Sequence, residues 1–304
     1  MSEGEAGGAP SPAWRHESLA PGLHLLATPI GNARDITLRA LDVLASADVL
    51  AAEDTRAARR LMEIHAIPRR GRPLLPYHDR GGPAQRPRLM THLEAGRSVA
   101  YVSDAGTPLV ADPGYRLATE AVAAGLPVHV APGPSAVLAA LSLAGLPSDR
   151  FLFAGFAPAA RAARRRWLQD LAGVPATLVF FETARRVSES FADLCETWGE
   201  DRRAALCREM TKRFEEVRRG TLGDLARSVA ETPPRGELVI VVDRKPADGA
   251  DPAAVDSALR GALARAPVRQ AADEVAAAFG RSRREMYQAA LRIRAGDEDG
   301  QGDA

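Results

Sequence analysis

The sequence predicts an α/β fold of two domains, followed by a small helical domain. From residue 21 onward, short apolar segments of strand length alternate with amphipathic segments of helical length, a pattern typical of α/β domains. Gly- and Pro-bearing turns end several of the strands. Beyond residue 252 only helical patterns remain, which predicts a separate helical unit.

The composition is that of a globular protein. The 304 residues are 46% hydrophobic and 26% charged, which suffices for two domains and an appendage. No apolar run approaches the roughly 18 residues of a membrane span. Residues 1–20 lack the apolar stretch of a signal peptide. We therefore expect a cytoplasmic protein without a membrane segment, in which residues 1–20 form a disordered tail.

Cysteine content and net charge exclude few classes of function. Cys195 and Cys207 have no CxxC spacing, so we expect neither a disulfide framework nor a metal site. The net charge of +1 neither favours nor excludes nucleic acid. Arginines cluster at 69–72, 161–166 and 281–284, where they would either neutralise phosphates or form solvated surface.

The first α/β domain is predicted over residues 21–132. Its first strand, 23–28, is followed by a tight turn that contains Pro29, Gly31 and Asn32. Asp35 is the expected N-cap of the first helix. Further strands are predicted at 49–53, 74–78, 98–103 and 127–131, and helices at 55–66, 87–95 and 115–124.

The second α/β domain is predicted over residues 133–243. It opens with a helix at 136–144, directly after the turn Gly133-Pro134-Ser135. Because only residues 210–213 separate two of its strands, we predict a hairpin and hence a mixed sheet. Strands are predicted at 151–156, 177–183, 203–209, 214–218 and 237–243, with helices between several of them, including 184–198 and 222–230.

The remainder divides into a linker over 244–252, a helical domain over 253–295 and a disordered end over 296–304. Two helices are predicted in this domain, at 268–279 and 282–293, with a break at Gly280. Such a pair is typical of a helix-turn-helix, and equally of a plain helical hairpin.

Three turns at strand ends are the candidate binding elements. The sequence contains no P-loop, HExxH or GxSxG, and the turn after the first strand lacks the glycines that cradle a pyrophosphate. Residues 103–108, SDAGTP, leave a strand at its carboxyl end, where ligands bind in open α/β sheets. Residues 112–114 and 132–135 form similar turns. Each alone is ordinary for a loop, but together they would wall one crevice.

Seven motifs in order give the chain a family resemblance. The pattern closely resembles the tetrapyrrole methylase (class III) superfamily, and within it the enzymes that methylate the 2′-hydroxyl of a cytidine in small-subunit (16S) ribosomal RNA. The resemblance covers about 23–243, and Phe stands at 180–181 where that pattern has Tyr. The motifs are TPIGN (28–32), AAEDTR (51–56), SDAGTPLVADPG (103–114), PGPSA (132–136), AGLPSDRF (144–151), REMTK (208–212) and GE (236–237).

The resemblance implies a homodimer of tetrapyrrole-methylase-like fold, with S-adenosylmethionine in the cleft between the two α/β domains. Small and aliphatic residues suit adenosine, and the carboxylate of Asp104 would face the sulfonium. The implied partner is small-subunit ribosomal RNA or the ribosomal subunit. Carried onto this chain, the cofactor pocket comprises Ile30, Asp104, Thr107, Val110, Ser135, Ala136, Phe181, Leu206 and Glu237.

Methyl transfer to a ribose hydroxyl is an in-line displacement that depends on alignment, helped by a base or a cation. Asp54, Glu209 and Lys212 are the candidate catalytic residues, and Glu53 and His78 are further candidates. Each has an ordinary alternative. Asp54 would cap the next helix or pair with Arg56, His78 would be a loop histidine, and Lys212 would contact only a phosphate.

Candidate RNA contacts are six arginines whose clusters, with the helical tail, favour RNA as substrate. Two other functions fit the same fold. One is carbon methylation of a tetrapyrrole. The other is a non-catalytic RNA-binding or assembly protein with a vestigial pocket, against which the intact SDAGTP and PGPSA motifs weigh. The six arginines are Arg56, Arg164, Arg165, Arg166, Arg283 and Arg284.

Overall fold

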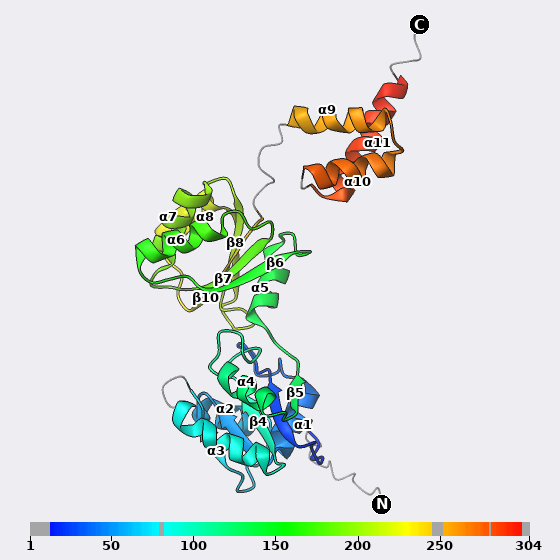
Figure 1. Ribbon diagram of the computed structural model, residues 1–304. Helices are drawn as coiled ribbons and strands as arrows, with labels where there is room; N and C mark the ends of the chain where they lie inside the picture. The colour runs from blue at the N-terminus through cyan, green and yellow to red at the C-terminus, as the bar shows by residue number, and fades with distance from the viewer. Residues whose placement is uncertain (1–12, 79–81, 245–251, 280, 300–304) are drawn as a thin grey trace, which may run out of the picture.

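The computed structural model describes residues 13–78, 82–244, 252–279 and 281–299. Within them the chain forms two α/β units, each around its own sheet, and a group of helices at the C-terminal end (Figure 1). Most of the tail predicted over 1–20, the linker over 244–252 and the end over 296–304 lies outside the described residues. No helix in the described part of the chain is long and apolar enough to cross a membrane.

The first sheet is entirely parallel, in the order β3-β2-β4-β1-β5. Every residue of β1, β2 and β4 is buried, as expected for a parallel sheet that helices cover on both faces. Because β1 and β4 are neighbours, the loops at their carboxyl ends lie side by side. The strands are β1 (Gly22–Leu26), β2 (Val49–Ala52), β3 (Leu74–Pro76), β4 (Ser98–Val102) and β5 (Val128–Ala131).

Two separate cores cover the faces of this sheet. Helices α1 (Leu38–Ser46) and α2 (Thr55–Ile64) pack on one face, and α3 (Gly82–Glu94) and α4 (Tyr115–Ala123) on the other. The N-cap of α1 is Thr37, whose hydroxyl accepts a bond of 3.2 Å from the amide of Ala40, so the expectation that Asp35 caps it is wrong.

The starts of α2 and α3 show how local sequence sets a helix boundary. Asp54 caps α2, because its carboxylate accepts a bond of 2.7 Å from the amide of Arg56. Helix α3 begins at Gly82, earlier than predicted, and contains Pro87. Pro87 has no amide proton, so α3 gives up one backbone hydrogen bond there.

The second sheet is mixed, as predicted, in the order β6-β7-β10-β8-β9. Strands β6 and β7 are parallel, and the other neighbours are antiparallel. The predicted hairpin is the β8–β9 pair, although β9 begins two residues later than expected. The strands are β6 (Phe151–Phe156), β7 (Thr177–Thr183), β8 (Arg203–Arg208), β9 (Glu216–Thr221) and β10 (Glu237–Val242).

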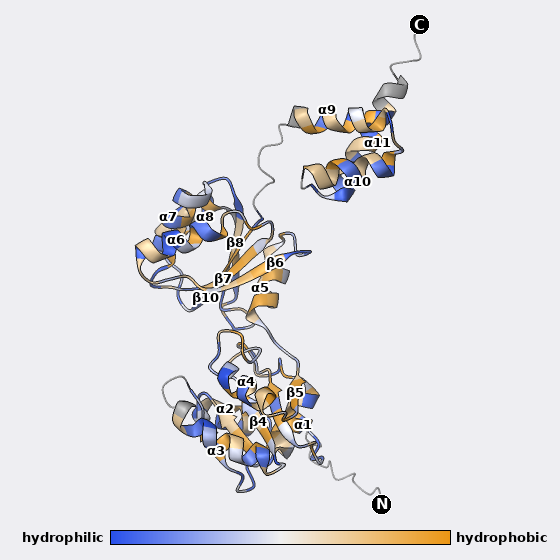
Figure 2. Cartoon of the chain, in the orientation of Figure 1, coloured by the Kyte–Doolittle hydropathy of each residue, from blue (hydrophilic) through white to orange (hydrophobic). Residues whose placement is uncertain are grey.

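Helices cover both faces of the second sheet. The apolar helix α5 (Ala136–Ala144) packs on one face, where its orange colour in Figure 2 matches that of the strands. The other face carries α6 (Arg161–Leu171), α7 (Val187–Trp198) and α8 (Leu222–Glu231). Helix α6 was not among the predicted helices. Cys195 and Cys207 are both free thiols.

The C-terminal unit contains α9 (Pro252–Leu263), α10 (Val268–Ala278) and α11 (Arg283–Asp299). The two predicted helices correspond to α10 and α11, and α9 precedes them. Leu259, Ala272 and Ala290 are almost fully buried in a core formed only by these helices and the turns between them. The predicted fold class, two α/β units and a helical appendage, is confirmed.

Candidate functional site

The loops after β1, β4 and β5 are joined to one another by hydrogen bonds. The main chains of Thr28 and Gly106 exchange two bonds of 3.0 and 2.9 Å. The hydroxyl of Thr28 donates to the carbonyl of Ser103 at 2.9 Å, and that of Thr107 donates to the carbonyl of Pro134 at 3.0 Å. The structure therefore brings together the TPIGN, SDAGTP and PGPSA turns.

Glycine allows two of these loops to approach closely. Gly106 has a φ of +79°, and a Cβ atom placed there would lie 3.3 Å from Cγ2 of Ile30. Ile30 itself is only 8% exposed and packs in the same core as Val137 and Val239 of the second α/β unit. The turn after β1 thus connects the two units.

The β8–β9 loop makes a second connection to the same turn. The amide of Asn32 donates to the hydroxyl of Thr211 at 3.1 Å. A Cβ atom at Gly31 would lie 2.5 Å from Cγ of Lys212 and 2.6 Å from the Thr211 hydroxyl, so only glycine permits this contact. Glu209 and Thr211 have φ values of +47° and +63°, and such strained residues concentrate at functional sites.

Lys212 is held between two carboxylates. Its Nζ donates to Oε1 of Glu209 at 3.0 Å and to Oε2 of Glu237 at 2.9 Å. Burial acts to lower the pKa of Lys212, but the bonds to Glu237 and Glu209 outweigh it and raise that pKa. The amide of Glu237 and Lys212 lower the pKa of Glu209. At neutral pH the lysine is therefore a cation beside ionised Glu209, not a base.

Asp54 and Asp104 line a cavity of about 180 Å³ beside these loops. Oδ1 of Asp104 accepts a hydrogen bond of 2.8 Å from the amide of Asp54. Partial burial raises the pKa of Asp104, and the charges of Asp54 and Asp112 act in the same direction, against the opposing hydrogen bond from the Asp54 amide. The charges of Asp54 and Asp112, unlike burial, make the site electronegative, which favours a bound cation. Other lining residues include Pro29, Gly31, Ala57 and Arg60.

The other predicted cofactor residues differ in where their side chains lie. Ala136 and Phe181 are partly buried against the same core as Ile30, and Ser135 caps α5 by accepting a bond of 3.4 Å from the amide of Leu138. Val110 is 38% exposed. The side chain of Leu206 is buried on the α7–α8 face of the sheet, opposite Ile30, because neighbouring strand residues point to opposite faces, so a contact with the cofactor would have to come from its main chain.

The predicted RNA contacts also divide. Arg164 requires a correction, because its side chain is 1% exposed and binds the equally buried Asp193 at 2.7 Å, out of reach of a phosphate. Arg165 is half-buried and pairs with Glu196 at 2.5 Å, and Arg283 pairs with Asp273 at 3.5 Å. Arg56, Arg166 and Arg284 are exposed.

Several contacts that assemble the site had no signal in the sequence. The bonds of Thr28 to Ser103 and of Asn32 to Thr211 join residues 75 and 179 positions apart. Tyr101 is a third case: its hydroxyl donates to Asp112 at 2.6 Å and holds the loop after β4. The candidate residue His78 follows β3 at the edge of the sheet. Two strand positions separate β3 from β4, whose loop is part of the site.

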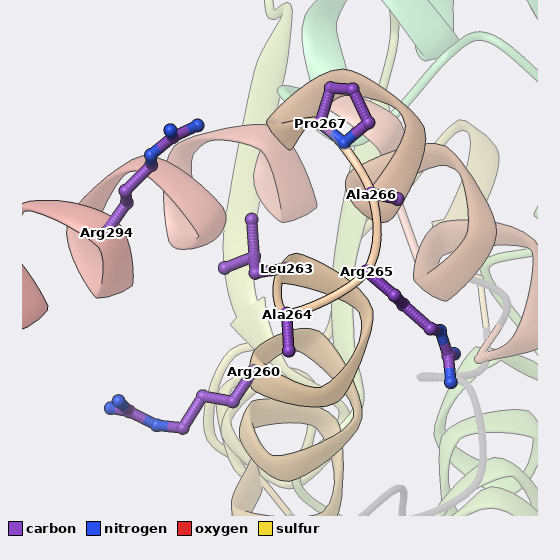
Figure 3. Close-up of a pocket in the computed structure, with 7 residues that line it drawn as sticks. All are labelled: Arg260, Leu263, Ala264, Arg265, Ala266, Pro267 and Arg294. Atoms are coloured by element: carbon purple, nitrogen blue, oxygen red, sulfur yellow. The ribbon is translucent and has the colours of Figure 1, made fainter.

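A further cavity, of about 580 Å³, lies at the turn between α9 and α10 (Figure 3). It is lined by Arg260, Arg265 and Arg294 with apolar residues between them. Figure 3 shows that the Arg265 side chain points away from Arg260 and Arg294. Arg265 pairs with Glu274 at 2.7 Å. Because the guanidinium groups do not converge, this cavity is not built for a small anion.

Comparisons with known proteins agree with this architecture. Residues 22–226 match the model of the Tetrapyrrole (Corrin/Porphyrin) Methylases, and residues 249–294 match that of the RsmI C-terminal HTH domain. The second match decides between the two predicted arrangements of the tail in favour of a helix-turn-helix. A uroporphyrin-III C-methyltransferase from Thermus thermophilus superposes with a TM-score of 0.52 at 25% identity, over 73% of this chain and 94% of that one.

Curated relatives cover nearly the whole chain. A "Ribosomal RNA small subunit methyltransferase I" from Mesorhizobium japonicum is 48% identical over 94% of this chain and 96% of its own length. The protein of the same name from Pseudomonas aeruginosa is 42% identical, over 88% and 96%. A conserved hypothetical protein from Aeropyrum pernix has the same fold, with a TM-score of 0.57 at 20% identity over 91% of this chain and 98% of that one.

The fold and the loops that join its two α/β units define a methyltransferase that depends on S-adenosylmethionine. More narrowly, the chain belongs to the ribosomal RNA small subunit methyltransferase I group of the tetrapyrrole methylase family.

Proposed function

We propose that this enzyme transfers a methyl group from S-adenosylmethionine to the 2′-hydroxyl of a cytidine in small-subunit ribosomal RNA. The observation that carries the proposal is the 48% identity with a relative named for small-subunit ribosomal RNA, over 94% of this chain. The joined loops at the ends of β1, β4 and β5 supply a site for the chemistry.

The residues of these loops fit the methyl donor. Ile30, Ala136 and Phe181 offer apolar surface to adenosine. Gly106 leaves open the space beside Ile30 that a side chain would occupy. Asp104 lies close enough to feel the charges of Asp54 and Asp112, and this group of carboxylates suits a sulfonium. We therefore assign Ile30, Asp104, Thr107, Val110, Ser135, Ala136, Phe181 and Glu237 to the cofactor pocket, and omit the side chain of Leu206.

When bound, S-adenosylmethionine supplies an electrophilic methyl group on a positively charged sulfur. Asp54 lies at the cavity with one carboxylate oxygen engaged by the Arg56 amide, and we assign it to accept the proton that the ribose hydroxyl loses. Lys212 stays protonated and stabilises negative charge near the reacting oxygen, while Glu209 positions Lys212. The hydrogen-bonded loops fix the alignment that an in-line displacement needs.

We further propose that the enzyme is a cytoplasmic homodimer. Ribosomal RNA as substrate implies the cytoplasm of a bacterial cell. Support for a partner chain comes from β6, an edge strand whose Phe151, Leu152 and Phe156 are 42%, 36% and 53% exposed. Exposed apolar side chains on an edge strand are a surface that proteins normally cover. The domain limits proposed are 21–132, 133–243 and 253–295.

The experiment uses purified protein, labelled S-adenosylmethionine and small ribosomal subunits from cells that lack the corresponding enzyme, together with RNA extracted from them. We expect label in a 2′-O-methylcytidine after nuclease digestion and mass spectrometry. Label in a porphyrin precursor and none in RNA would instead establish the tetrapyrrole reaction. Calorimetry that detects no cofactor binding would establish a vestigial pocket.

A further inference from the structure

Helix α2 exposes three arginines for which the described part of the chain provides no acidic partner. Arg56, Arg59 and Arg60 are all exposed, whereas Ala58 and Met62 form the buried side of the helix. Within the described residues, no carboxylate oxygen lies within 4.0 Å of their guanidinium nitrogens. Many other surface arginines do have such a partner, for example Arg227 with Asp224 at 2.6 Å. The charge of this face is therefore free to bind an anionic ligand.

The exposed side of α2 that carries Arg56, Arg59 and Arg60 borders the cavity beside the joined loops after β1, β4 and β5. Arg60 lines that cavity together with Asp54 and Asp104, and Ala57 lies between the arginines on the same helix. Both ends of α2 are fixed to the loops. Asp54 is bonded to Asp104 at its start, and Nε2 of His65 lies 2.9 Å from the carbonyl of Ala33 at its end. The arginines therefore hold a set position relative to the reacting groups.

The size and lining of the cavity indicate what it accepts. Its volume of about 180 Å³ is below the range of about 300–1,000 Å³ that larger ligands occupy, so it suits one nucleoside better than a whole S-adenosylmethionine. Ala57, Leu61 and Ile64 form an apolar wall against which a base would pack. Asp54 and Asp104 supply polar groups at the side of the joined loops.

We propose that α2 is the RNA-docking element of the enzyme. This inference rests on the proposed function, in which RNA is the substrate. The cavity takes the nucleoside to be methylated, and Arg56, Arg59 and Arg60 bind the phosphates beside it. Arg56 and Arg60 are separated by roughly 6 Å along the helix axis, so they contact phosphates of neighbouring nucleotides. A nucleoside in the cavity must leave any helical stack, so the strand recognised here is single-stranded.

The first test replaces the three arginines by glutamine, as Arg56→Gln, Arg59→Gln and Arg60→Gln in one chain. We expect KM for the RNA substrate to rise at least tenfold while cofactor affinity stays unchanged. The slope of log affinity against log salt should become shallower by about 2, because each single-strand phosphate contact contributes about 0.7. The matched control removes Arg88, Arg116 and Arg227 in the same way, from α3, α4 and α8, and should keep the wild-type slope.

The second test fills the cavity with Ala57→Leu. We expect kcat/KM for RNA to fall at least tenfold with unchanged affinity for S-adenosylmethionine in calorimetry. Ala192→Leu, at an exposed position of α7, is the control and should behave as wild type. If Ala57→Leu weakens cofactor binding tenfold instead, the cavity holds the donor and the inference is wrong.

Two failures are distinguishable. If the wild-type enzyme transfers no methyl group to RNA, the proposed function is wrong. If the wild type methylates RNA and the triple arginine variant retains its KM and its salt slope, the proposed function stands and the role of α2 is refuted.

Discussion

The backbone amide of Asp54 donates a hydrogen bond of 2.8 Å to Oδ1 of Asp104, which ties the first residue before α2 to the loop after β4. The two residues are 50 positions apart in sequence. Because Asp54 also caps α2, one short segment sets the direction of that helix and the orientation of a carboxylate at the site. The predictions below start from this arrangement.

Asp104→Asn should weaken S-adenosylmethionine binding by about tenfold while the fold stays intact, since a charge-assisted contact of roughly 1.5 kcal/mol is lost. Calorimetry on both proteins measures this. Unchanged affinity would remove Asp104 from the cofactor site.

The same variant should show a pH-dependent change in stability. The folded-state pKa of Asp104 is raised above the ordinary 3.8, so the folded protein holds this proton more tightly than the unfolded chain. The stabilisation is complete below about pH 3.8 and is lost as the pH rises through the folded-state pKa. Urea titrations at pH 4 and pH 7 should therefore show Asp104→Asn gaining stability relative to wild type at the higher pH.

Gly31→Ala should reduce kcat/KM at least tenfold. The added Cβ would lie 2.5 Å from Cγ of Lys212 and 2.9 Å from the carbonyl of Met210, so the β8–β9 loop must move away from the turn after β1. Overpacking of this kind costs about 1–3 kcal/mol, which a thermal melt detects. Gly173→Ala is the control, because no heavy atom lies within 4 Å of its added Cβ. Equal activity of the two variants would contradict the prediction.

Lys212→Met should lower kcat at least tenfold with little change in KM, because a cation near the developing charge is lost. Steady-state kinetics with saturating cofactor measure the split. Stability gives a second readout. The pKa of Glu209 is lowered in the folded protein, so its stabilising contribution is present above the ordinary 4.5 and lost as the pH falls. The stability difference between wild type and Lys212→Met should therefore shrink below about pH 4.5.

Asp193→Ala should destabilise the enzyme by about 3–5 kcal/mol, because it leaves the buried guanidinium of Arg164 with only the exposed Glu189, 3.4 Å away, as a carboxylate partner. Chemical denaturation followed by circular dichroism measures the loss. Glu196→Ala removes the half-exposed partner of Arg165 and should cost less than about 1 kcal/mol. Similar losses in the two variants would show that Arg164 is not a core residue.

Much of the fold was predictable because burial leaves a local pattern. Strands buried on both faces, such as β1 and β4, appear as mostly apolar segments without strict alternation. The short 210–213 segment correctly predicted the β8–β9 hairpin. Helix α6 was not named from the sequence because its buried side includes Arg164, whose main partner Asp193 is 29 residues away. A charged residue whose partner is distant in sequence is indistinguishable, in the sequence alone, from a solvent-exposed residue.

The site was predictable as a set of loops but not as a set of contacts. The turns at 103–108 and 132–135 lie together as expected, and the turn after β1 joins them, because all three follow neighbouring parallel strands. The face on which Leu206 points was missed, since a shift of one residue along a strand reverses the side chain. Of the three exposed arginines of α2, only Arg56 was predicted as an RNA contact. Local sequence does not show whether an arginine pairs with a carboxylate far away in the chain.

The C-terminal helices have one more consequence for the enzyme. Among the described residues, their core consists of buried side chains between Val255 and Ile293 and includes none from either sheet. A substitution that opens a void at Leu259 or Ala272 is therefore expected to loosen the helical unit while the packing of both sheets is unchanged.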